Sequence, residues 1–448
     1  MEAAEKKLVD KIIKKIDENR EAVIAFGRDI YTHAELGFKE FRSAGKFAER
    51  LRSLNLPAVE TGLALTGVRG WLKPKGPGLT LALIGEMDAL RIPAHRRANP
   101  DTQAAHCCGH HAQLTGVLGA AFALSDPEVA AALHGNVAFF AVPAEEYGEI
   151  AFRNQLKAEG KIRYGGGKCE LIRTGAFDDI DLSIVHHSDE GGISVGNGGS
   201  NGFVSKVIRI FGRAAHAAAA PHKGINALNA AALGHTALQY QRETFRDEDH
   251  VRVHPIITKG GELVNVIPGE VSLEAQVRGK NTGAILDAER KTDRAYKAGA
   301  DALGAGYEIE TMPGYLPQIP GAPNPALVEA VKLACPGREF TLVDTSCHSG
   351  ASTDVGDLQH IQPVLTFHTG GVAGAIHSLD FDVVDEDEAY IVTAKIFALG
   401  AYLLLKDGAL RARELVNNYR PLFTKETYIE FMESLVRTER KEAAGNEW

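Results

Sequence analysis

Three stretches of the chain are continuously apolar and end abruptly in residues that can bind a metal or move a proton. A short apolar run of this kind is typical of a strand buried on both faces of a parallel sheet. Helical patterns lie between the runs, so we predict an α/β fold with a mostly parallel sheet, which binds ligands at its strand ends. The runs and their endings are "LTLALIGEMDAL" with Glu86 and Asp88, "NVAFFAVPAEE" with Glu145 and Glu146, and "DLSIVHH" with His186 and His187.

The pattern changes after Gly199. There "FVSKVIRIFG" alternates like a half-buried strand, "INALNAAALGHTALQYQ" has helical periodicity, and "GGELVNVIPGEVSLEAQVRG" resembles paired strands. The α/β pattern resumes at "NPALVEAVKLA". We therefore expect a discontinuous catalytic domain, residues 1–200 and 319–448, with an inserted α+β domain at residues 201–318.

Composition and charge narrow the class of protein. The 448 residues carry a formal net charge of −9, which argues against nucleic acid as a partner because phosphate binding needs a basic surface. No apolar run approaches the roughly 20 residues of a membrane helix, and the charged N-terminus lacks a signal-peptide core. Five cysteines without regular spacing do not indicate a disulfide framework. We expect a cytoplasmic enzyme that acts on a small molecule and needs neither nucleic acid nor membrane.

The stretch "HCCGHHAQ", residues 106–113, holds three histidines and two cysteines. A redox pair usually has two residues between its cysteines, and a structural zinc site needs paired Cys-x-x-Cys elements, so both are disfavoured. The acids at the end of a single strand are usually only solvated. Three strands that end in acids or histidines, together with this stretch, favour a metal site. Further along, "GGVAGAIHSLDF" places His377 in a glycine-rich loop that can close over the same edge. Mixed imidazole, carboxylate and thiolate ligands suit Mn, Zn or Co.

The adjacent pair Glu145 and Glu146 has a chemical logic of its own. Neighbouring residues at a strand end point in different directions, so one carboxylate can bind an ion while the other faces a water molecule. A divalent metal lowers the pKa of a bound water toward about 7, and the free carboxylate can accept its proton. The pair therefore points to a hydrolase.

The ordered motifs resemble a family of metal-dependent amidohydrolases and peptidases that includes carboxypeptidase G, the aminoacylases, the indole-acetyl-amino-acid hydrolases and p-aminobenzoyl-glutamate hydrolase. The family's "DMDAL" is similar to "EMDAL" here, and its "HACGHD" to "HCCGHH". Each motif alone is weak, but the ordered series is specific and spans nearly the whole chain. The resemblance implies a metallopeptidase-like catalytic domain and a lid domain that forms homodimers or larger homo-oligomers. The other matching stretches are "HAELGFKEF", "PAEE", "GRAAHAAAAPHKGINAL", "GGELVNVIPGEVSLEAQVR", "STDVGDL" and "IHS".

The resemblance also implies roles for individual residues. Glu145 would be the general base, and Asp88 would orient a ligand imidazole. In the lid, His216 would polarise the substrate oxygen across the dimer, and Asn265 and Arg278 would hold the substrate carboxylate. The implied metal ligands are Cys108, His110, Glu146, His377 and one strand-end histidine, either the favoured His187 or His186.

Several positions depart from the family pattern. Glu86 stands at the first acid of "DMDAL", His111 replaces an acid, and Gln113 occupies the following histidine position. An imidazole in place of a carboxylate removes negative charge from the ion's surroundings and should weaken metal binding. We therefore expect one labile divalent ion per chain rather than a tightly held pair.

These features predict a metal-dependent hydrolase that cleaves a C–N bond in a small carboxylate-bearing substrate. One hypothesis is arylamine deamination, because the altered site leaves room for the ring-carbon chemistry of the family's 5-nitroanthranilic acid aminohydrolase. The alternative is an amidohydrolase of N-acyl or N-aroyl amino acids. A third hypothesis, a non-catalytic member that binds a carboxylate ligand, is disfavoured because the implied catalytic positions are present.

Overall fold

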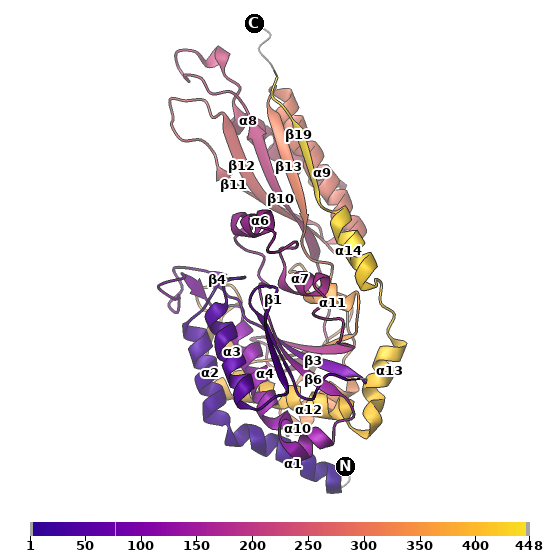
Figure 1. The fold of residues 1–448 in the computed structure, drawn as a ribbon. Coiled ribbons are helices and arrows are strands. Elements are labelled where there is room, and N and C mark those ends of the chain that lie inside the picture. The colour runs from indigo at the N-terminus through magenta and orange to yellow at the C-terminus, as the bar shows by residue number, and fades with distance from the viewer. Residues whose placement is uncertain (1–2, 77, 445–448) are drawn as a thin grey trace. The chain divides into compact units, whose positions relative to one another are not determined.

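The structure is a computed structural model that describes residues 3–76 and 78–444 (Figure 1). The chain divides into two compact units. The first contains the residues up to Gly199 together with Ile319–Cys347 and Asp357–Lys425. The second contains Ser200–Gln318, His348–Gly356 and the residues from Glu426 onward.

The first unit is built on an eight-stranded sheet in the order β1-β2-β6-β3-β7-β16-β8-β14. At its centre β3 runs parallel to β6 and β7, and β7 runs parallel to β16. The strands β1 and β2 form an antiparallel pair at one edge. The predicted α/β class with a mostly parallel sheet is confirmed. The strands are β1 (Ala58–Leu63), β2 (Gly67–Trp71), β3 (Thr80–Glu86), β6 (Asn136–Val142), β7 (Leu182–Ser188), β8 (Ser194–Val195), β14 (Thr341–Leu342) and β16 (Val364–Thr369).

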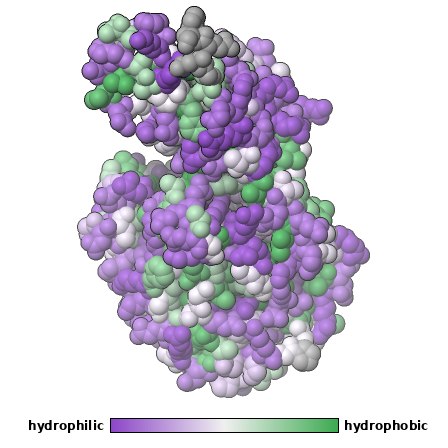
Figure 2. Space-filling model, turned by 45° about the horizontal axis from the view of Figure 1, so that its top comes forward, coloured by the Kyte–Doolittle hydropathy of each residue, from purple (hydrophilic) through white to green (hydrophobic). Residues whose placement is uncertain are grey.

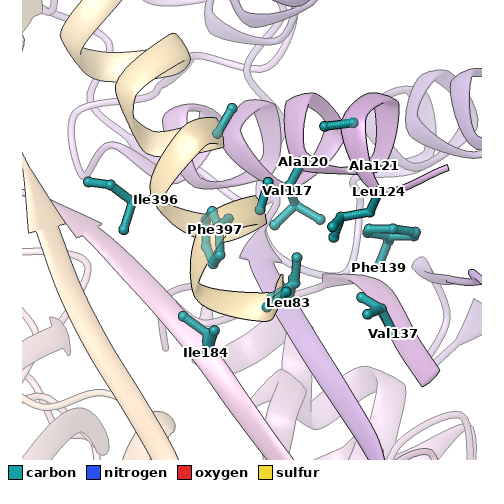
Figure 3. Close-up of a cluster of buried hydrophobic side chains, with 14 of the residues drawn as sticks. Leu83, Val117, Ala120, Ala121, Leu124, Val137, Phe139, Ile184, Ile396 and Phe397 are labelled. Atoms are coloured by element: carbon teal, nitrogen blue, oxygen red, sulfur yellow. The ribbon is translucent and has the colours of Figure 1, made fainter. Parts of the chain in front are cut away.

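Helices cover this sheet and bury its apolar side chains. Figure 3 shows Leu83 of β3 in one cluster with Val117 of α4 (His110–Leu124) and Phe397 of α12 (Thr393–Leu405). An added Cβ at Gly119 would lie 2.5 Å from the Cβ of Ala394, so only glycine permits this close approach of α4 and α12. The packing fixes α4, whose first residue is His110. The other helices of the first unit are α1 (Ala3–Glu18), α2 (Arg20–Thr32), α3 (Phe41–Ser53), α5 (Pro127–Ala131), α6 (Ile150–Ala158), α7 (Gly167–Arg173), α10 (Pro325–Ala334) and α13 (Leu410–Asn418).

One helix corrects the sequence prediction about apolar runs. The stretch Asp387–Leu405 is a 19-residue helix that is long and apolar enough to cross a membrane. However, 83% of its apolar window is buried inside the structure, where it packs against α4. Its hydropathy is therefore explained by its place in the core.

The second unit contains a five-stranded antiparallel sheet in the order β11-β12-β10-β13-β19. The helices α8 (Ala227–Gln241) and α9 (Thr282–Ala302) pack against each other and against the sheet. Along β12, fully buried residues alternate with half-buried ones, as expected when one face is covered. The strands are β10 (Gly202–Phe211), β11 (Arg252–Lys259), β12 (Glu270–Gly279), β13 (Gly306–Pro313) and β19 (Arg437–Lys441).

The C-terminal segment differs from the predicted domain boundaries. The sequence predicts that residues 319–448 belong to the first domain, but β19 extends the sheet of the second unit by pairing with β13. The sequence of β19, "RTERK", is polar throughout because it forms an edge, so it carries no apolar signal of a strand. The remaining short elements are β4 (Leu90–Arg91), β5 (Ala104–Ala105), β9 (Gly199–Ser200), β15 (His348–Ser349), β17 (Val372–Ala373), β18 (Asp382–Val383), α11 (Val355–Gln359) and α14 (Lys425–Ser434).

Candidate metal centre

Neighbouring strands of the first unit bring the candidate residues to one edge of the sheet. β3 ends at Glu86, Glu145 follows β6 closely, and His187 lies in β7. Parallel strands present their carboxyl ends at the same edge. The turn before α4 uses Gly109 at a φ of 89°, and a Cβ there would lie 2.5 Å from the hydroxyl of Ser188. This close turn holds the "HCCGHH" stretch against the end of β7.

Two groups of potential metal donors share the thiol of Cys108. In each group the donor atoms all lie within 4.8 Å of one another. The Sγ atom of Cys108 is 3.3 Å from Nε2 of His187 and 3.3 Å from Nε2 of His377. Nε2 of His377 is in turn 2.9 Å from Oε1 of Glu146. The groups are Cys108, His110 and His187, and Cys108, Glu146 and His377.

The donor set fits a divalent cation. Two atoms that each lie about 2.1 Å from one ion are roughly 3 Å apart when the bond angle is near 90°, which is close to the contacts of 2.9 and 3.3 Å. Nε2 of His110 and Oε1 of Glu146 are buried and make no hydrogen bond of good geometry with any described residue. Burial and the Glu146 carboxylate raise the pKa of the Cys108 thiol well above its usual range, so its thiolate needs a cation beside it.

The two strand-end histidines point in different directions. His187 contacts Cys108, whereas Nε2 of His186 is 2.7 Å from the hydroxyl of Thr369 and its ring lies 5.0 Å from that of Phe367. Successive side chains of a strand face opposite sides, so only one of them can join the donor groups. The geometry places His187 there.

The loop that carries His377 closes over this edge, as its glycine-rich sequence suggests. The backbone N–H of His377 donates to the carbonyl of Cys107 at 2.8 Å. His377 has a φ of 65°, an unusual backbone conformation for a residue other than glycine. The loop backbone therefore binds directly to the "HCCGHH" stretch and delivers the imidazole to Cys108.

Asp88 is fully buried and organises two parts of the centre. Its carboxylate accepts hydrogen bonds from the backbone N–H groups of Glu145 at 3.1 Å and Glu146 at 2.8 Å. Nδ1 of His110 lies 2.9 Å from the backbone carbonyl of Asp88, which can only accept. Nδ1 therefore carries a proton, and Nε2 is the nitrogen of His110 that faces the donor groups.

The two adjacent glutamates occupy different positions. Glu146 contacts His377 within a donor group that contains Cys108. Glu145 lies outside both of these groups, with Oε2 3.8 Å from Nε2 of His110, and forms a third group with His110 and Glu86. This arrangement allows one carboxylate to bind an ion while its neighbour handles a proton.

His111, one of the departures from the family pattern, does not reach the donor groups. Its ring stacks on that of Tyr31 at a centroid distance of 4.5 Å and lies 5.3 Å from the ring of His106. Burial lowers the pKa of His111 to about 3, so the ring is neutral. Its effect on a bound ion is therefore indirect.

The other two departures bind each other. The side-chain amide of Gln113 donates to Oε2 of Glu86 at 2.8 Å, and its carbonyl accepts from the backbone N–H of Glu86 at 3.2 Å. The other oxygen of Glu86 pairs with the ammonium of Lys168, which is fully buried. Burial alone would raise the pKa of Glu86, but the Lys168 charge lowers it below its ordinary value, so the carboxylate is ionised. Negative charge is thus retained beside the centre.

Sequence reasoning assigned no role to Lys168 or Glu40. Lys168 lies in "GGGKCELIR", where no periodicity marks a buried lysine. Glu40 is fully buried, and the oxygens of its carboxyl group accept from the hydroxyl of Thr66 at 2.7 Å and from the backbone N–H of Ala144 at 2.8 Å. Ala144 has a φ of 53°, so Glu40 holds the unusual backbone turn that leads into Glu145.

We predict that Glu40→Gln flattens the pH dependence of stability. Burial and the Asp88 charge raise the pKa of Glu40 to about 8 in the folded chain. Between about pH 4.5 and pH 8 the unfolded chain loses this proton while the folded chain keeps it, so stability falls as the pH rises. Glutamine cannot ionise, so the variant should lose less stability over this range, by up to about 5 kcal/mol. Urea unfolding of both proteins at several pH values measures the difference.

A matched control for this prediction is Glu49→Gln, which removes an exposed carboxylate from α3, the helix that Glu40 precedes. It should leave the pH dependence of unfolding close to that of the parent protein. Identical pH slopes for Glu40→Gln and the parent would contradict the raised pKa of Glu40.

The three remaining predicted residues, His216, Asn265 and Arg278, belong to the second unit. Nδ1 of His216 accepts backbone hydrogen bonds from Ala218 and Ala219, which leaves Nε2 as the N–H donor. A backbone hydrogen bond of 2.9 Å from residue 217 to the carbonyl of Asn265 ties the His216 loop to the Asn265 loop. Arg278, in β12, donates to the hydroxyl of Ser352 at 2.8 Å. Their roles toward a substrate stay predictions.

Comparisons with known proteins identify the family of the chain. Residues 82–401, more than half of the chain, match peptidase family M20/M25/M40. The Xaa-Arg dipeptidase of Mus musculus is 28% identical over 439 residues, covering 93% of this chain and 90% of the relative. The N-acyl-L-amino acid amidohydrolase of Geobacillus stearothermophilus is 27% identical, covering 69% and 81%.

Solved structures share the fold. A dinuclear metal-binding M20 peptidase from Bacillus subtilis superimposes with a TM-score of 0.60 at 22% identity, covering 87% of this chain and 99% of that one. The aminobenzoyl-glutamate utilization protein from Klebsiella pneumoniae gives a TM-score of 0.62 at 20% identity, covering 90% and 97%. With the family match, these findings confirm the resemblance seen in the sequence motifs. The chain belongs to peptidase family M20/M25/M40 and is a hydrolase of carbon–nitrogen bonds.

Proposed function

We propose that the protein is a metal-dependent amidohydrolase that cleaves the amide bond of an N-acyl or N-aroyl amino acid. The proposal rests on one observation, the different positions of the adjacent residues Glu145 and Glu146. Glu146 lies in a donor group with Cys108 and His377, whereas Glu145 stands outside it, beside His110. The names of the relatives support the substrate class, since they include an N-acyl-L-amino acid amidohydrolase, a p-aminobenzoyl-glutamate hydrolase subunit and an indole-3-acetyl-aspartic acid hydrolase.

The chain's own residues supply the proton transfers of this reaction. A divalent ion held by the two donor groups would polarise the substrate carbonyl and acidify a water molecule. Glu145 would take the proton of the attacking water and deliver it to the leaving nitrogen. Asp88 fixes the backbone of Glu145 through its hydrogen bond, so the general base is held in place.

The residues of the second unit would bind the substrate. His216 would donate from Nε2 to the oxygen that becomes negative as the carbonyl is attacked. Arg278 would pair with the substrate carboxylate, with Asn265 as a further hydrogen-bond donor. These roles follow from the family resemblance, and the available N–H of His216 is compatible with its part.

The metal content is also a proposal. Manganese, zinc and cobalt all suit the imidazole, carboxylate and thiolate donors. The sequence departures predict one labile ion, whereas two donor groups that share Cys108 support a capacity of two. Titration of the metal-free protein, with metal counted per chain, distinguishes these numbers.

Product analysis tests the substrate class. The metal-loaded protein should release free amino acid from N-acyl or N-aroyl amino acids, and a chelator should abolish the release. The relatives favour this outcome over arylamine deamination, which their names do not include. Ammonia and a hydroxylated ring from 5-nitroanthranilate, without amide cleavage, would overturn the proposal in favour of the arylamine hypothesis. Failure of the folded, metal-loaded protein to turn over either class would contradict both.

We further propose that the protein works in the cytoplasm as a homodimer or larger homo-oligomer. The face in Figure 2 is largely hydrophilic, with apolar residues scattered among the polar ones. On the second unit, however, Ile256 and Ile257 of the edge strand β11 are each 51% exposed, and Tyr240 at the end of α8 is 75% exposed. An exposed apolar edge strand is a surface suited to pairing with another copy. Light scattering should give at least twice the chain mass of 48.1 kDa.

A further inference from the structure

We propose that Glu86 is an additional carboxylate ligand of the ion that binds at His110. The inference rests on the metal centre of the proposed function and deepens it. Glu86 stands at a position where the sequence departs from the family pattern, and neither donor group with Cys108 contains it. It belongs instead to the third group, with His110 and Glu145.

The position of Glu86 matches that of a ligand. Its Oε2 atom lies 3.1 Å from Nε2 of His110. Two atoms bound to one ion at about 2.1 Å are separated by roughly this distance. Glu86 is only 4% exposed and His110 is fully buried, so bulk water does not separate the two atoms.

The ring of His110 is oriented toward Glu86. Nδ1 of His110 lies 2.9 Å from the carbonyl of Asp88, to which it donates, and this leaves Nε2 as the ring nitrogen that faces the Glu86 carboxylate. A cation that replaced the proton at Nε2 would lie beside both Nε2 of His110 and Oε2 of Glu86. Nε2 of His110 also makes no hydrogen bond of good geometry within the described ranges, so it is available to a metal ion.

The surroundings of Glu86 hold its carboxylate in this orientation. Lys168 binds Oε1, which turns Oε2 toward His110. Gln113 donates to Oε2 from the next turn of α4, three residues after His110. A carboxylate oxygen accepts more than one partner, so Oε2 can bind Gln113 and an ion together. Lys168 and Gln113 therefore act as positioning residues for Glu86.

A carboxylate ligand alters which metals the centre prefers. Oxygen donors suit manganese, whereas thiolate and imidazole donors suit zinc. Removal of the Glu86 charge should therefore weaken Mn²⁺ binding more than Zn²⁺ binding. The expected loss of Mn²⁺ affinity is about 10–100-fold, the range seen when groups around a metal are removed.

The test compares Mn²⁺ and Zn²⁺ titrations of the full-length, metal-free protein and its variants. Glu86→Gln removes the carboxylate that pairs with the buried ammonium of Lys168, which can destabilise the fold. The double variant Glu86→Gln with Lys168→Met removes both charges of this pair. Circular dichroism establishes that each variant is folded. Lys168→Met alone, which keeps the Glu86 charge, should show a smaller loss of Mn²⁺ affinity than the double variant.

Each outcome of the titration decides a different point. A selective loss of Mn²⁺ affinity in the folded double variant supports Glu86 as a ligand. Unchanged Mn²⁺ affinity in that variant overturns the inference and leaves the proposed function intact. Failure of the parent protein to bind either metal overturns the metal centre itself, and the inference falls with it.

Discussion

Glu145→Gln should lower kcat by about 10²–10⁴-fold, the range that general acid–base catalysis contributes. Glutamine is nearly the same size as glutamate but cannot accept the proton of the attacking water. The backbone N–H of residue 145 would still bind Asp88, so the turn should keep its shape. Metal binding should change little, because Oε2 of Glu145 lies 3.8 Å from Nε2 of His110, farther than the Glu86 carboxylate at 3.1 Å. Steady-state kinetics together with metal analysis of the purified variant measure the two effects separately.

Glu146→Gln is the contrasting variant for this prediction. It removes the carboxylate that contacts His377, so it should lose metal and activity together. Glu149→Gln is the matched neutral control, since Glu149 pairs with Lys39 away from the donor groups. If Glu145→Gln lost its metal as readily as Glu146→Gln, Glu145 would be a ligand rather than the general base.

The sequence predicts which acids lie at the edge of the sheet, because a strand that is buried on both faces has a continuously apolar sequence. β3 and β6 are buried on both faces, so their sequences are apolar until the strands end. An acid directly after such a run must lie at the end of a strand, and parallel strands end together. Glu86 and Glu145 could therefore be placed near each other from spacing alone.

The partners of these residues leave no such signal. Lys168 and Glu86 lie 82 positions apart and meet only through the packing of α7 against the strand ends. Gln113 follows Glu86 by 27 residues and compensates for it by hydrogen bonding. Taken separately in the sequence, Glu86 and Gln113 are two unrelated departures from the family pattern. Their contact cannot be seen there, because a hydrogen bond between two distant elements leaves no periodic pattern.

The choice between His186 and His187 shows a similar limit. Alternation along a strand requires the two side chains to face opposite ways. It does not say which face meets the donor groups, because that depends on what packs on each side of the sheet. In the structure the rings of Phe367 and Phe397 lie next to His186, so His187 is left for the metal edge. Only the packed core decides this point.

Cys108→Ser should cause the largest loss of metal affinity, because both donor groups contain this one side chain. A serine hydroxyl does not ionise near neutral pH, so an anionic ligand is replaced by a weak neutral one. We expect the affinity for Zn²⁺ to fall by at least about 100-fold, the upper end of the effect of removing a group that only supports a ligand. The value of kcat/KM at limiting metal should fall in parallel.

Cys107→Ser provides a matched control for the same chemical change one residue away. Cys107 is equally buried but packs with Phe381 and Val372, and its thiol contacts only the carbonyl of Ala105 among the described hydrogen bonds. Its substitution should reduce stability slightly, since a hydroxyl is less suited to an apolar site, while metal affinity stays near that of the parent. Zinc titration of both variants against a competing chelator separates the two cysteines. Equal losses of Zn²⁺ affinity in both variants would mean that disturbed packing of the stretch weakens metal binding. That result would contradict the role of the Cys108 thiol as a ligand shared by the two donor groups.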